Sequence, residues 1–227
     1  MTIQTAQLPG QRRPRNGSAT ATAGIAPARS IGRASLVAGV GLLLMSALAA
    51  FGKVVVLDGL VTPGDAAQTA KDIGANEGLF RLGIASLVLV IALDLVVAWS
   101  LYRVLRPVSA RLSMIAAALR TVYAGVFLIA LGPLWAEHTT TFDDIWHAGL
   151  FLFGLHLILI GYLASRSRYV PRAIGVLLVV AGLGYGIDTV GRVLTTGTWT
   201  DVSSFTFIGE FLLALWLVIR GRRLSSI

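Results

Sequence analysis

Six ionisable side chains lie inside or at the ends of long apolar stretches, where charged groups are rare. Placing a charge at the centre of a bilayer costs at least about 2.5–3.5 kcal/mol, so such residues usually pair with one another or mark a path for protons or ligands. Any chemistry in this chain should therefore involve them. They are Asp94, Arg120, His156, Asp188, Arg192 and Glu210.

Asp94 and Arg120 are predicted to form a buried ion pair. Asp94 comes shortly before the end of one apolar run, and Arg120 lies at a similar distance from the start of the next. At about 1.5 Å per residue, both should lie about 10–12 Å from the same end of two neighbouring helices. Such a pair is either a structural clamp between helices or part of a relay for protons or substrate.

A second polar cluster is predicted near the outer ends of the last two apolar runs. Tyr185, Asp188 and Arg192 are spaced i, i+3 and i+7, which places them on one helical face. Glu210 enters the following run at a depth that should match that of Asp188. These four residues could bind a small molecule, or they could form a self-neutralising network that braces the two helices. Both interpretations stay open on the sequence alone.

His156 lies near the middle of its apolar run, but no second ligand is expected at its depth. His147 should lie about half a revolution away around the helix, and His138 falls in a loop. Metal and haem sites need several convergent ligands. We therefore predict no metal and no cofactor, and we expect a neutral His156 bonded to a neighbouring helix.

Motifs of common enzyme classes are missing from the sequence. The chain has no cysteine, which excludes disulfides and thiolate chemistry. It also lacks G-x-S-x-G, H-E-x-x-H and the P-loop. No catalytic residue is predicted, and the protein is more simply explained as a non-enzyme.

The elements that must position these residues are predicted to be membrane-spanning helices. Of 227 residues, 56% are hydrophobic and 13% are charged, with a mean hydropathy of +0.78, whereas soluble domains average about 25% charged residues. A helical span needs roughly 20 apolar residues. We predict an all-α integral membrane bundle of six transmembrane helices. The expected spans are 34–57, 82–101, 112–135, 146–164, 173–194 and 202–219.

The distribution of charge predicts the orientation of these spans. Arginines gather in the connections 103–111 and 166–172 and near both ends of the chain, whereas the acidic residues of the connections fall on the opposite side. The positive-inside rule then places both termini in the cytoplasm. The net charge of +8 is explained by topology and by attraction to membrane lipids, so no nucleic-acid partner is predicted.

The ends of the chain are expected to lie outside the bundle. Residues 1–30 have the composition of a disordered basic cytoplasmic tail, and 222–227 form a short basic cytoplasmic tail, so the transmembrane domain is 31–221. A cleaved signal peptide ending near Ala47-Leu48-Ala49 is the alternative for the first apolar run. The run continues beyond those residues, which favours a span.

Several short motifs occur in a characteristic order along the chain. They are Leu79–Ile84, Leu101–Val108, Phe153–His156, Gly161–Leu163, Tyr169–Arg172, Gly182–Asp188 and Gly209–Glu210. In this order they resemble the bacterial multi-pass membrane proteins of domain-of-unknown-function family 4386, over roughly 34–219. The resemblance implies a six-helix protein of the bacterial cytoplasmic (inner) membrane and supplies no catalytic or binding residues. Ser109 stands where an asparagine is expected after Arg-Pro-Val.

Three functions are compatible with these features. The first is a membrane protein that binds or translocates a small molecule through an outer-facing polar site at Tyr185, Asp188, Arg192 and Glu210. The second is an intramembrane enzyme that acts on a lipid or isoprenoid. The third is an accessory or regulatory partner of another membrane protein, although the sequence indicates no particular protein partner.

Overall fold

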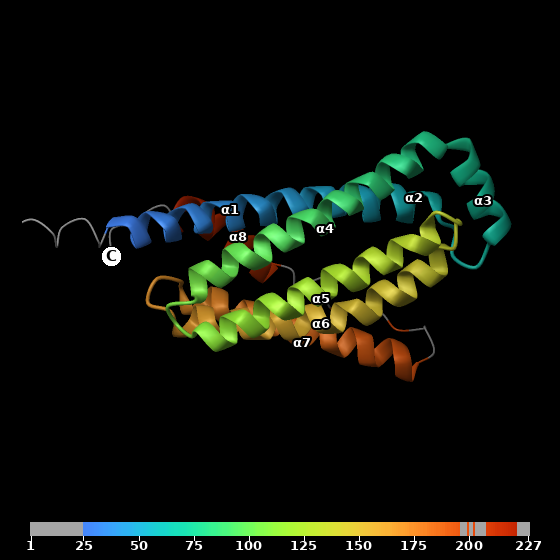
Figure 1. The fold of residues 1–227 in the computed structure, drawn as a ribbon. Coiled ribbons are helices and arrows are strands. Elements are labelled where there is room, and N and C mark those ends of the chain that lie inside the picture. Colours follow the sequence, from blue (N-terminus) through green and yellow to red (C-terminus); the bar gives the residue numbers. More distant parts are fainter. Residues whose placement is uncertain (1–24, 196–198, 200–201, 203–207, 222–227) are drawn as a thin grey trace, which may run out of the picture.

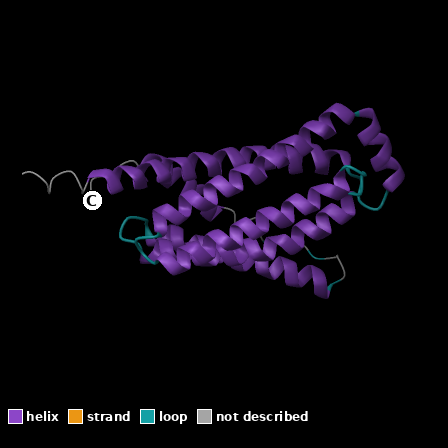
Figure 2. Cartoon of the chain, in the orientation of Figure 1, coloured by secondary structure: helices purple, strands orange, loops and turns teal. Residues whose placement is uncertain are grey.

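The structure, a computed structural model, describes residues 25–195, 199, 202 and 208–221, with side chains from Ile31 onward. Within these residues the chain is helical, without strands, and its loops are short (Figure 2). The predicted tails, 1–30 and 222–227, fall largely outside the described residues, although the first helix already begins at Ile25. The helices are α1 (Ile25–Ala49), the π-helix η1 (Ala50–Leu57), α2 (Asp58–Leu60), α3 (Ala66–Ala75), α4 (Glu77–Leu105), α5 (Ala110–Leu134), α6 (Thr139–Arg166), α7 (Arg172–Leu194) and α8 (Ile208–Ile219).

Five helical segments are long and apolar enough to cross a membrane. They are Ile31–Leu60, Glu77–Leu105, Ala110–Leu134, Thr139–Arg166 and Arg172–Leu194. These segments correspond to the first five predicted spans. Their length and composition are those of a multi-pass membrane protein.

The sixth predicted span, 202–219, is only partly matched by a helix. The described helix there is α8, an apolar helix of 12 residues. At about 1.5 Å per residue it measures about 18 Å, against a hydrocarbon core of about 30 Å. Residues 203–207 lie outside the described part of the chain. The structure therefore shows five full-length candidate spans and one shorter apolar helix, and the count of six stays a prediction.

The six apolar segments form a closed ring. Each long helix packs against its neighbours in the sequence from α4 to α8, and α8 packs against α1, which in turn packs against α4. Figure 1 shows these helices aligned along one axis, with α3 at one end of the molecule and the connection between α4 and α5 at the other. The contact between α8 and α1 is fixed by Ser35, whose hydroxyl donates to the carbonyl oxygen of Leu217 at 3.3 Å. The ring surrounds a space to which all six segments contribute.

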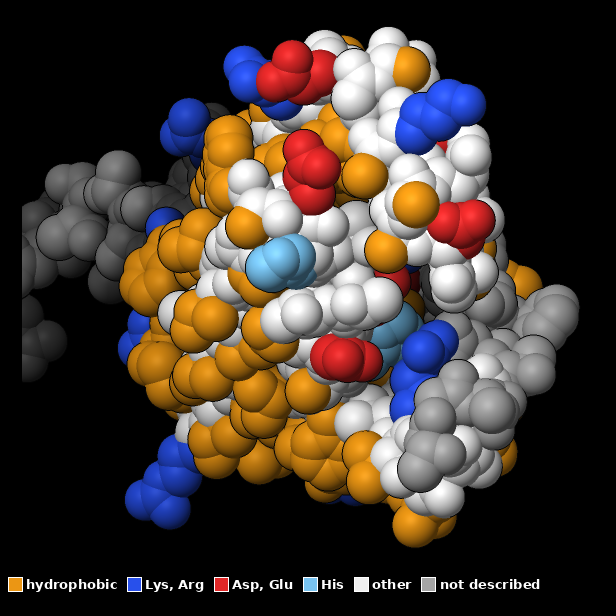
Figure 3. Space-filling view, turned by 90° about the vertical axis from the view of Figure 1, so that its right-hand side faces the viewer, with side chains coloured by type: hydrophobic (Ala, Val, Ile, Leu, Met, Phe, Trp, Pro, Cys, Tyr) orange, Lys and Arg blue, Asp and Glu red, His pale blue; other side chains and the backbone are white. Residues whose placement is uncertain are grey.

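The outer surface of the ring is unusually apolar. Large hydrophobic side chains such as Ile129 and Val193 are 67% and 75% exposed. Soluble monomers rarely expose large contiguous apolar patches, whereas a bilayer is a suitable solvent for such a surface. The end of the molecule that carries α3 differs, because charged and small polar groups cover its centre while hydrophobic groups lie on its flanks (Figure 3). This pattern is that of a span end that faces water.

Paired glycines set the close approach of α6 and α7. A Cβ atom at Gly182 would lie 2.4 Å from the carbonyl oxygen of Gly154, and one at Gly175 would lie 2.6 Å from that of Gly161. Both pairs fit one antiparallel register, because the two glycines on each helix are seven positions apart. Small residues at such contacts let helix backbones pack closely in membranes.

The first span contains a π-helical segment that sequence reasoning did not anticipate. In η1 the N–H of Asp58 donates to the carbonyl oxygen of Lys53, which is the i→i+5 pattern of a π-helix. The side chains of the same two residues form an ion pair. Short π-helical segments occur often at functional sites, and this one lies beside the cavity described below.

Two contacts fix the loops at the end of the molecule opposite α3, between α4 and α5 and between α6 and α7. The hydroxyl of Ser109 accepts from the N–H of Leu112 at 3.4 Å, so this serine acts as an N-cap, a role that asparagine fills equally well. The hydroxyl of Tyr169 donates to the carbonyl oxygen of Val104 at 2.5 Å. Burial raises the pKa of Tyr169 to about 12, so the phenol stays protonated and remains a donor at neutral pH.

Candidate functional site: a central polar cavity

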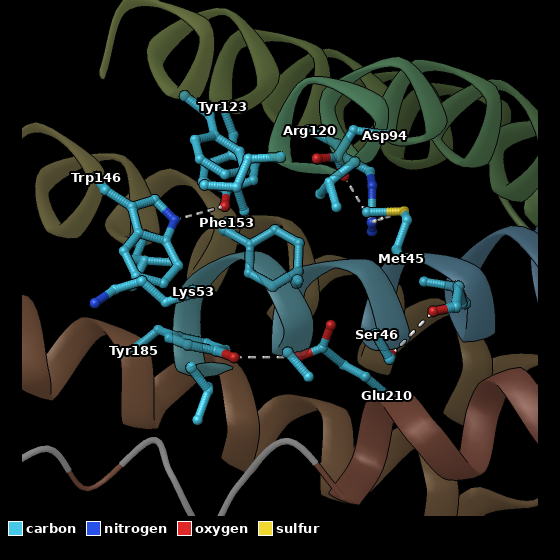
Figure 4. A pocket seen from close by; sticks show the side chains of 18 of the residues that line it. Met45, Ser46, Lys53, Asp94, Arg120, Tyr123, Trp146, Phe153, Tyr185 and Glu210 are labelled. Carbon is cyan, nitrogen blue, oxygen red and sulfur yellow. Dashed lines mark hydrogen bonds and ion pairs between the residues drawn. The ribbon is translucent and has the colours of Figure 1, made fainter. Parts of the chain in front are cut away.

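A cavity of about 420 Å³ lies inside the ring of helices. Its walls are mostly apolar and aromatic, and its size falls in the range of small-molecule pockets. Figure 4 shows polar side chains pointing into it from opposite walls, with Asp94 and Arg120 on one side and Tyr185 and Glu210 on the other. The polar and indole side chains of its lining are Ser46, Lys53, Asp94, Arg120, Tyr123, Trp146, Tyr185 and Glu210.

The structure brings Asp94 and Arg120 together at the wall formed by α4 and α5. Nη2 of Arg120 lies 2.8 Å from Oδ1 of Asp94, and each side chain is only 1% exposed. Counted from the end of α4 at Leu105 and from the start of α5 at Ala110, both residues lie about 15–16 Å along their helices. The equal depth on adjacent helices therefore places the charges in contact, at a somewhat greater depth than the sequence suggested.

His156 on α6 holds the other side of the guanidinium. Its Nδ1 lies 2.8 Å from the carbonyl oxygen of Ala116 on α5, to which it must donate. Nε2 is then an acceptor, and Nη1 of Arg120 donates to it at 3.2 Å. This assignment rests on the hydrogen-bond partners and corresponds to a neutral imidazole. His156 thus positions Arg120, a role that the sequence did not reveal.

The carboxylate of Asp94 has unused hydrogen-bonding capacity. Oδ1 is in contact with Arg120, whereas Oδ2 has no hydrogen-bond partner within the described structure. Nε of Arg120 also has no hydrogen-bond partner there. Buried polar atoms are nearly always satisfied in native proteins, so unsatisfied atoms beside a cavity indicate room for a polar ligand or water.

Glu210 lies at the depth of Asp94 and Arg120, which differs from its predicted position. Glu210 lies on α8 about 14 Å from the helix end at Ile219. Asp188 lies on α7 about 24 Å from the helix start at Arg172. The sequence prediction counted both residues from the outer ends of their spans, whereas these depths are counted from the opposite helix ends, at Ile219 and Arg172. The hydroxyl of Tyr185 donates to Oε1 of Glu210 at 3.5 Å across the α7–α8 contact.

Aromatic rings connect the two polar walls. The ring of Phe153 has its centroid 5.2 Å from Cζ of Arg120, 5.0 Å from the ring of Tyr123 and 5.5 Å from that of Tyr185. Nε1 of Trp146 donates to the hydroxyl of Tyr123 at 3.1 Å. These contacts fix the rings, so much of the cavity wall is a preformed aromatic surface.

Lys53 on η1 lies at the end of the cavity nearer α2, which we call the mouth (Lys53, Phe142 and Trp146). Its Nζ forms ion pairs with Asp58 and, at 3.4 Å, with Oδ1 of Asp143 on α6. Nζ also lies 5.5 Å from the centroid of the Trp146 ring. One lysine is thus shared by two carboxylates and an indole.

Asp188 and Arg192 do not line the cavity, within the part of the chain that the structure describes. Oδ1 of Asp188 instead accepts from Nε1 of Trp199 at 3.0 Å and from the N–H of Val202 at 2.7 Å. A Cβ atom at Gly191 would lie 2.3 Å from this indole. Asp188 therefore anchors the connection between α7 and α8. Of the four residues of the predicted outer cluster, only Tyr185 and Glu210 meet at the cavity.

The described residues contain no group of three His, Asp or Glu side chains that could hold a metal ion. The cavity offers acceptors, a fixed guanidinium and aromatic rings, which suit reversible binding of a small molecule. Sequence reasoning missed Tyr123, Trp146 and Phe153 as cavity residues, because aromatic residues in apolar runs are common and carry no signal of their own. It also missed Lys53, which lies on the π-helical segment η1.

Comparison with known proteins places the chain in a family. The family with the description "Domain of unknown function (DUF4386)" matches residues 37–136 and 134–221. The chain belongs to the DUF4386 family. It is also 42% identical over 144 residues to an uncharacterised protein from Archaeoglobus fulgidus. The aligned residues make up 63% of this chain and 86% of that protein. No solved structure matches the chain.

This relative corrects one expectation from the sequence. The resemblance was to bacterial proteins, whereas the relative is archaeal, so the likeness extends beyond bacteria. Family membership itself assigns no ligand and no reaction to this DUF4386 protein.

Proposed function

We propose that this DUF4386 protein binds a small molecule in its central cavity, as a carrier or receptor in the cytoplasmic membrane. The observation that supports the proposal best is the convergence of Asp94, Arg120, Tyr185 and Glu210 on one cavity of about 420 Å³. Intramembrane ionisable groups are costly, and those that do not simply clamp helices commonly serve ligands or ions. The site differs from the outer-facing cluster expected from the sequence, because Asp188 and Arg192 lie outside the cavity.

In this proposal six segments cross the membrane with both ends in the cytoplasm. The ring of helices supports it, because α8 fills the sixth position between α7 and α1. The partition of arginines and acidic residues between the connections supports the orientation.

An intramembrane enzyme that acts on a lipid or isoprenoid is the second candidate. Val54 and Phe211 line the cavity and are also 61% and 43% exposed. The cavity therefore reaches the lipid-facing surface, and two carboxylates, those of Asp94 and Glu210, lie on its walls.

Native mass spectrometry of protein purified in mild detergent tests the proposal. Ala49 lines the cavity, so Ala49→Phe should displace a retained small molecule. Ala118→Phe on the exposed face of α5 is the matched control and should retain it. Equal retention by both variants would contradict binding in the cavity, and retention of an altered lipid would favour the enzyme.

A further inference from the structure

The charged residues of the cavity walls balance in number, Lys53 and Arg120 against Asp94 and Glu210, but they are not all paired. The guanidinium of Arg120 is held by Asp94, His156 and the ring of Phe153. Across the described residues, no lysine or arginine forms an ion pair with Glu210, whose only hydrogen bond comes from the phenol of Tyr185. A carboxylate that forms no ion pair with any described residue is therefore available to a ligand.

Two carboxylates lie beside the mouth of the cavity. Asp58 and Asp143 are outside the cavity lining, and both form ion pairs with Lys53, which lines it. Near the mouth a ligand therefore meets two carboxylates for one ammonium group. An anion would be placed among like charges there, which is unfavourable, whereas a cation would be attracted.

The aromatic side chains of the cavity wall also favour a positively charged ligand. Aromatic faces attract cations within about 6 Å of the ring centroid, and the protein already uses two of them in this way, Phe153 for Arg120 and Trp146 for Lys53. Tyr185 presents a further ring beside Glu210. Aromatic walls around a carboxylate resemble the general arrangement that recognises alkylammonium groups.

Two further observations concern the rest of the ligand. Asp94 is only 1% exposed, and its Oδ2, which has no hydrogen-bond partner among the described residues, could accept a hydrogen bond from a ligand. The exposed cavity residues Val54 and Phe211 provide contact with the lipid-facing surface, which suits a molecule that partitions into the bilayer.

We infer that the ligand is a lipophilic organic cation, an amine or quaternary ammonium with an apolar group, whose charged head lies between Glu210 and the aromatic rings. This inference rests on the proposed function, because it names the class of small molecule that the cavity takes. Glu210 and Tyr185 hold the head, and the apolar wall between η1 and α8 holds the remainder.

Three probes that share a benzyl group test the charge preference on the wild-type protein. They are benzyltrimethylammonium, its uncharged carbon isostere neopentylbenzene, and the anion phenylmethanesulfonate. Isothermal titration calorimetry in detergent should show the ammonium binding at least about tenfold more tightly than the isostere, and the sulfonate binding most weakly. Empty micelles correct for partition into detergent.

The variant Glu210→Gln should lower the affinity for the ammonium to that for the isostere and leave the isostere unchanged. Glu210→Asp, which keeps the charge, should retain part of the preference. Equal binding of ammonium and isostere, or preference for the sulfonate, would overturn the cation assignment and leave the small-molecule cavity in place. Absence of binding by all three probes, in a protein that unfolds cooperatively, would overturn both. The wild-type comparison decides the question even if Glu210→Gln does not fold.

Discussion

Nη2 of Arg120 contacts Oδ1 of Asp94 at 2.8 Å while Nη1 of the same guanidinium donates to His156, so one arginine joins α4, α5 and α6. In a bilayer the cost of each charge depends on its partner. The pair is therefore both a link between helices and one wall of the cavity.

Asp94→Asn should destabilise the protein by about 3–5 kcal/mol, because it leaves the guanidinium of Arg120 buried without a counter-charge. The double variant Asp94→Asn with Arg120→Gln should be more stable than the single one, since no charge is left unpaired. Thermal unfolding in one detergent, followed by circular dichroism, compares the two. A double variant less stable than Asp94→Asn alone would contradict the pairing.

His156→Leu should cost about 1–3 kcal/mol, because both Nη1 of Arg120 and the carbonyl oxygen of Ala116 lose a buried partner. His156→Gln, whose amide has a donor and an acceptor, should recover part of this loss. Chemical unfolding measures both variants. If the leucine variant is as stable as the wild type, His156 does not position the arginine.

Gly182→Ala should destabilise the contact between α6 and α7 by about 1–3 kcal/mol, because the new methyl group would overlap the carbonyl oxygen of Gly154. Gly186, one turn away on α7, has no atom within 4 Å of such a methyl group. Gly186→Ala is therefore the matched control and should be neutral or slightly stabilising, since alanine favours helix. Equal melting temperatures for the two variants would contradict close packing at Gly182.

Asp188 and Glu210 should respond oppositely to substitution. Asp188→Ala removes the acceptor of Trp199 and Val202 and should cost about 1–3 kcal/mol of stability while the affinity for benzyltrimethylammonium stays unchanged. Glu210→Gln should lower that affinity and preserve most of the stability. Calorimetry and thermal unfolding on the same samples separate the two effects. A loss of binding in Asp188→Ala without unfolding would return Asp188 to the binding site.

The orientation can be tested with reporter fusions. A fusion after Gly221 should be active as a cytoplasmic reporter, and one inserted in α3 (Ala66–Ala75) should report the opposite side. Arginine-rich connections are retained in the cytoplasm during insertion, which is the reason for this expectation. A C-terminal reporter on the outer side would show that α8 does not cross the membrane.

The sequence predicted the long helices well, because apolar length is a strong signal in membranes. It also indicated that Asp94 and Arg120 should meet, since depth on adjacent helices can be counted from residue numbers. It placed Glu210 with Asp188 because their depths were counted from the outer ends of the predicted spans, and the mixed polar and apolar residues 202–207 give the last span no sharp outer end. The cavity itself depends on which helices become neighbours in the ring, and Lys53 enters it through a π-helical segment, a local change that composition does not reveal.

The position of Glu210 on α8 has a consequence for the biosynthesis of the protein. A carboxylate within an apolar helix makes independent insertion of that helix unfavourable. The packing partners of α8 are α7 and α1. The groove between these two helices must therefore stay vacant until α8 enters it, and only then is the cavity complete.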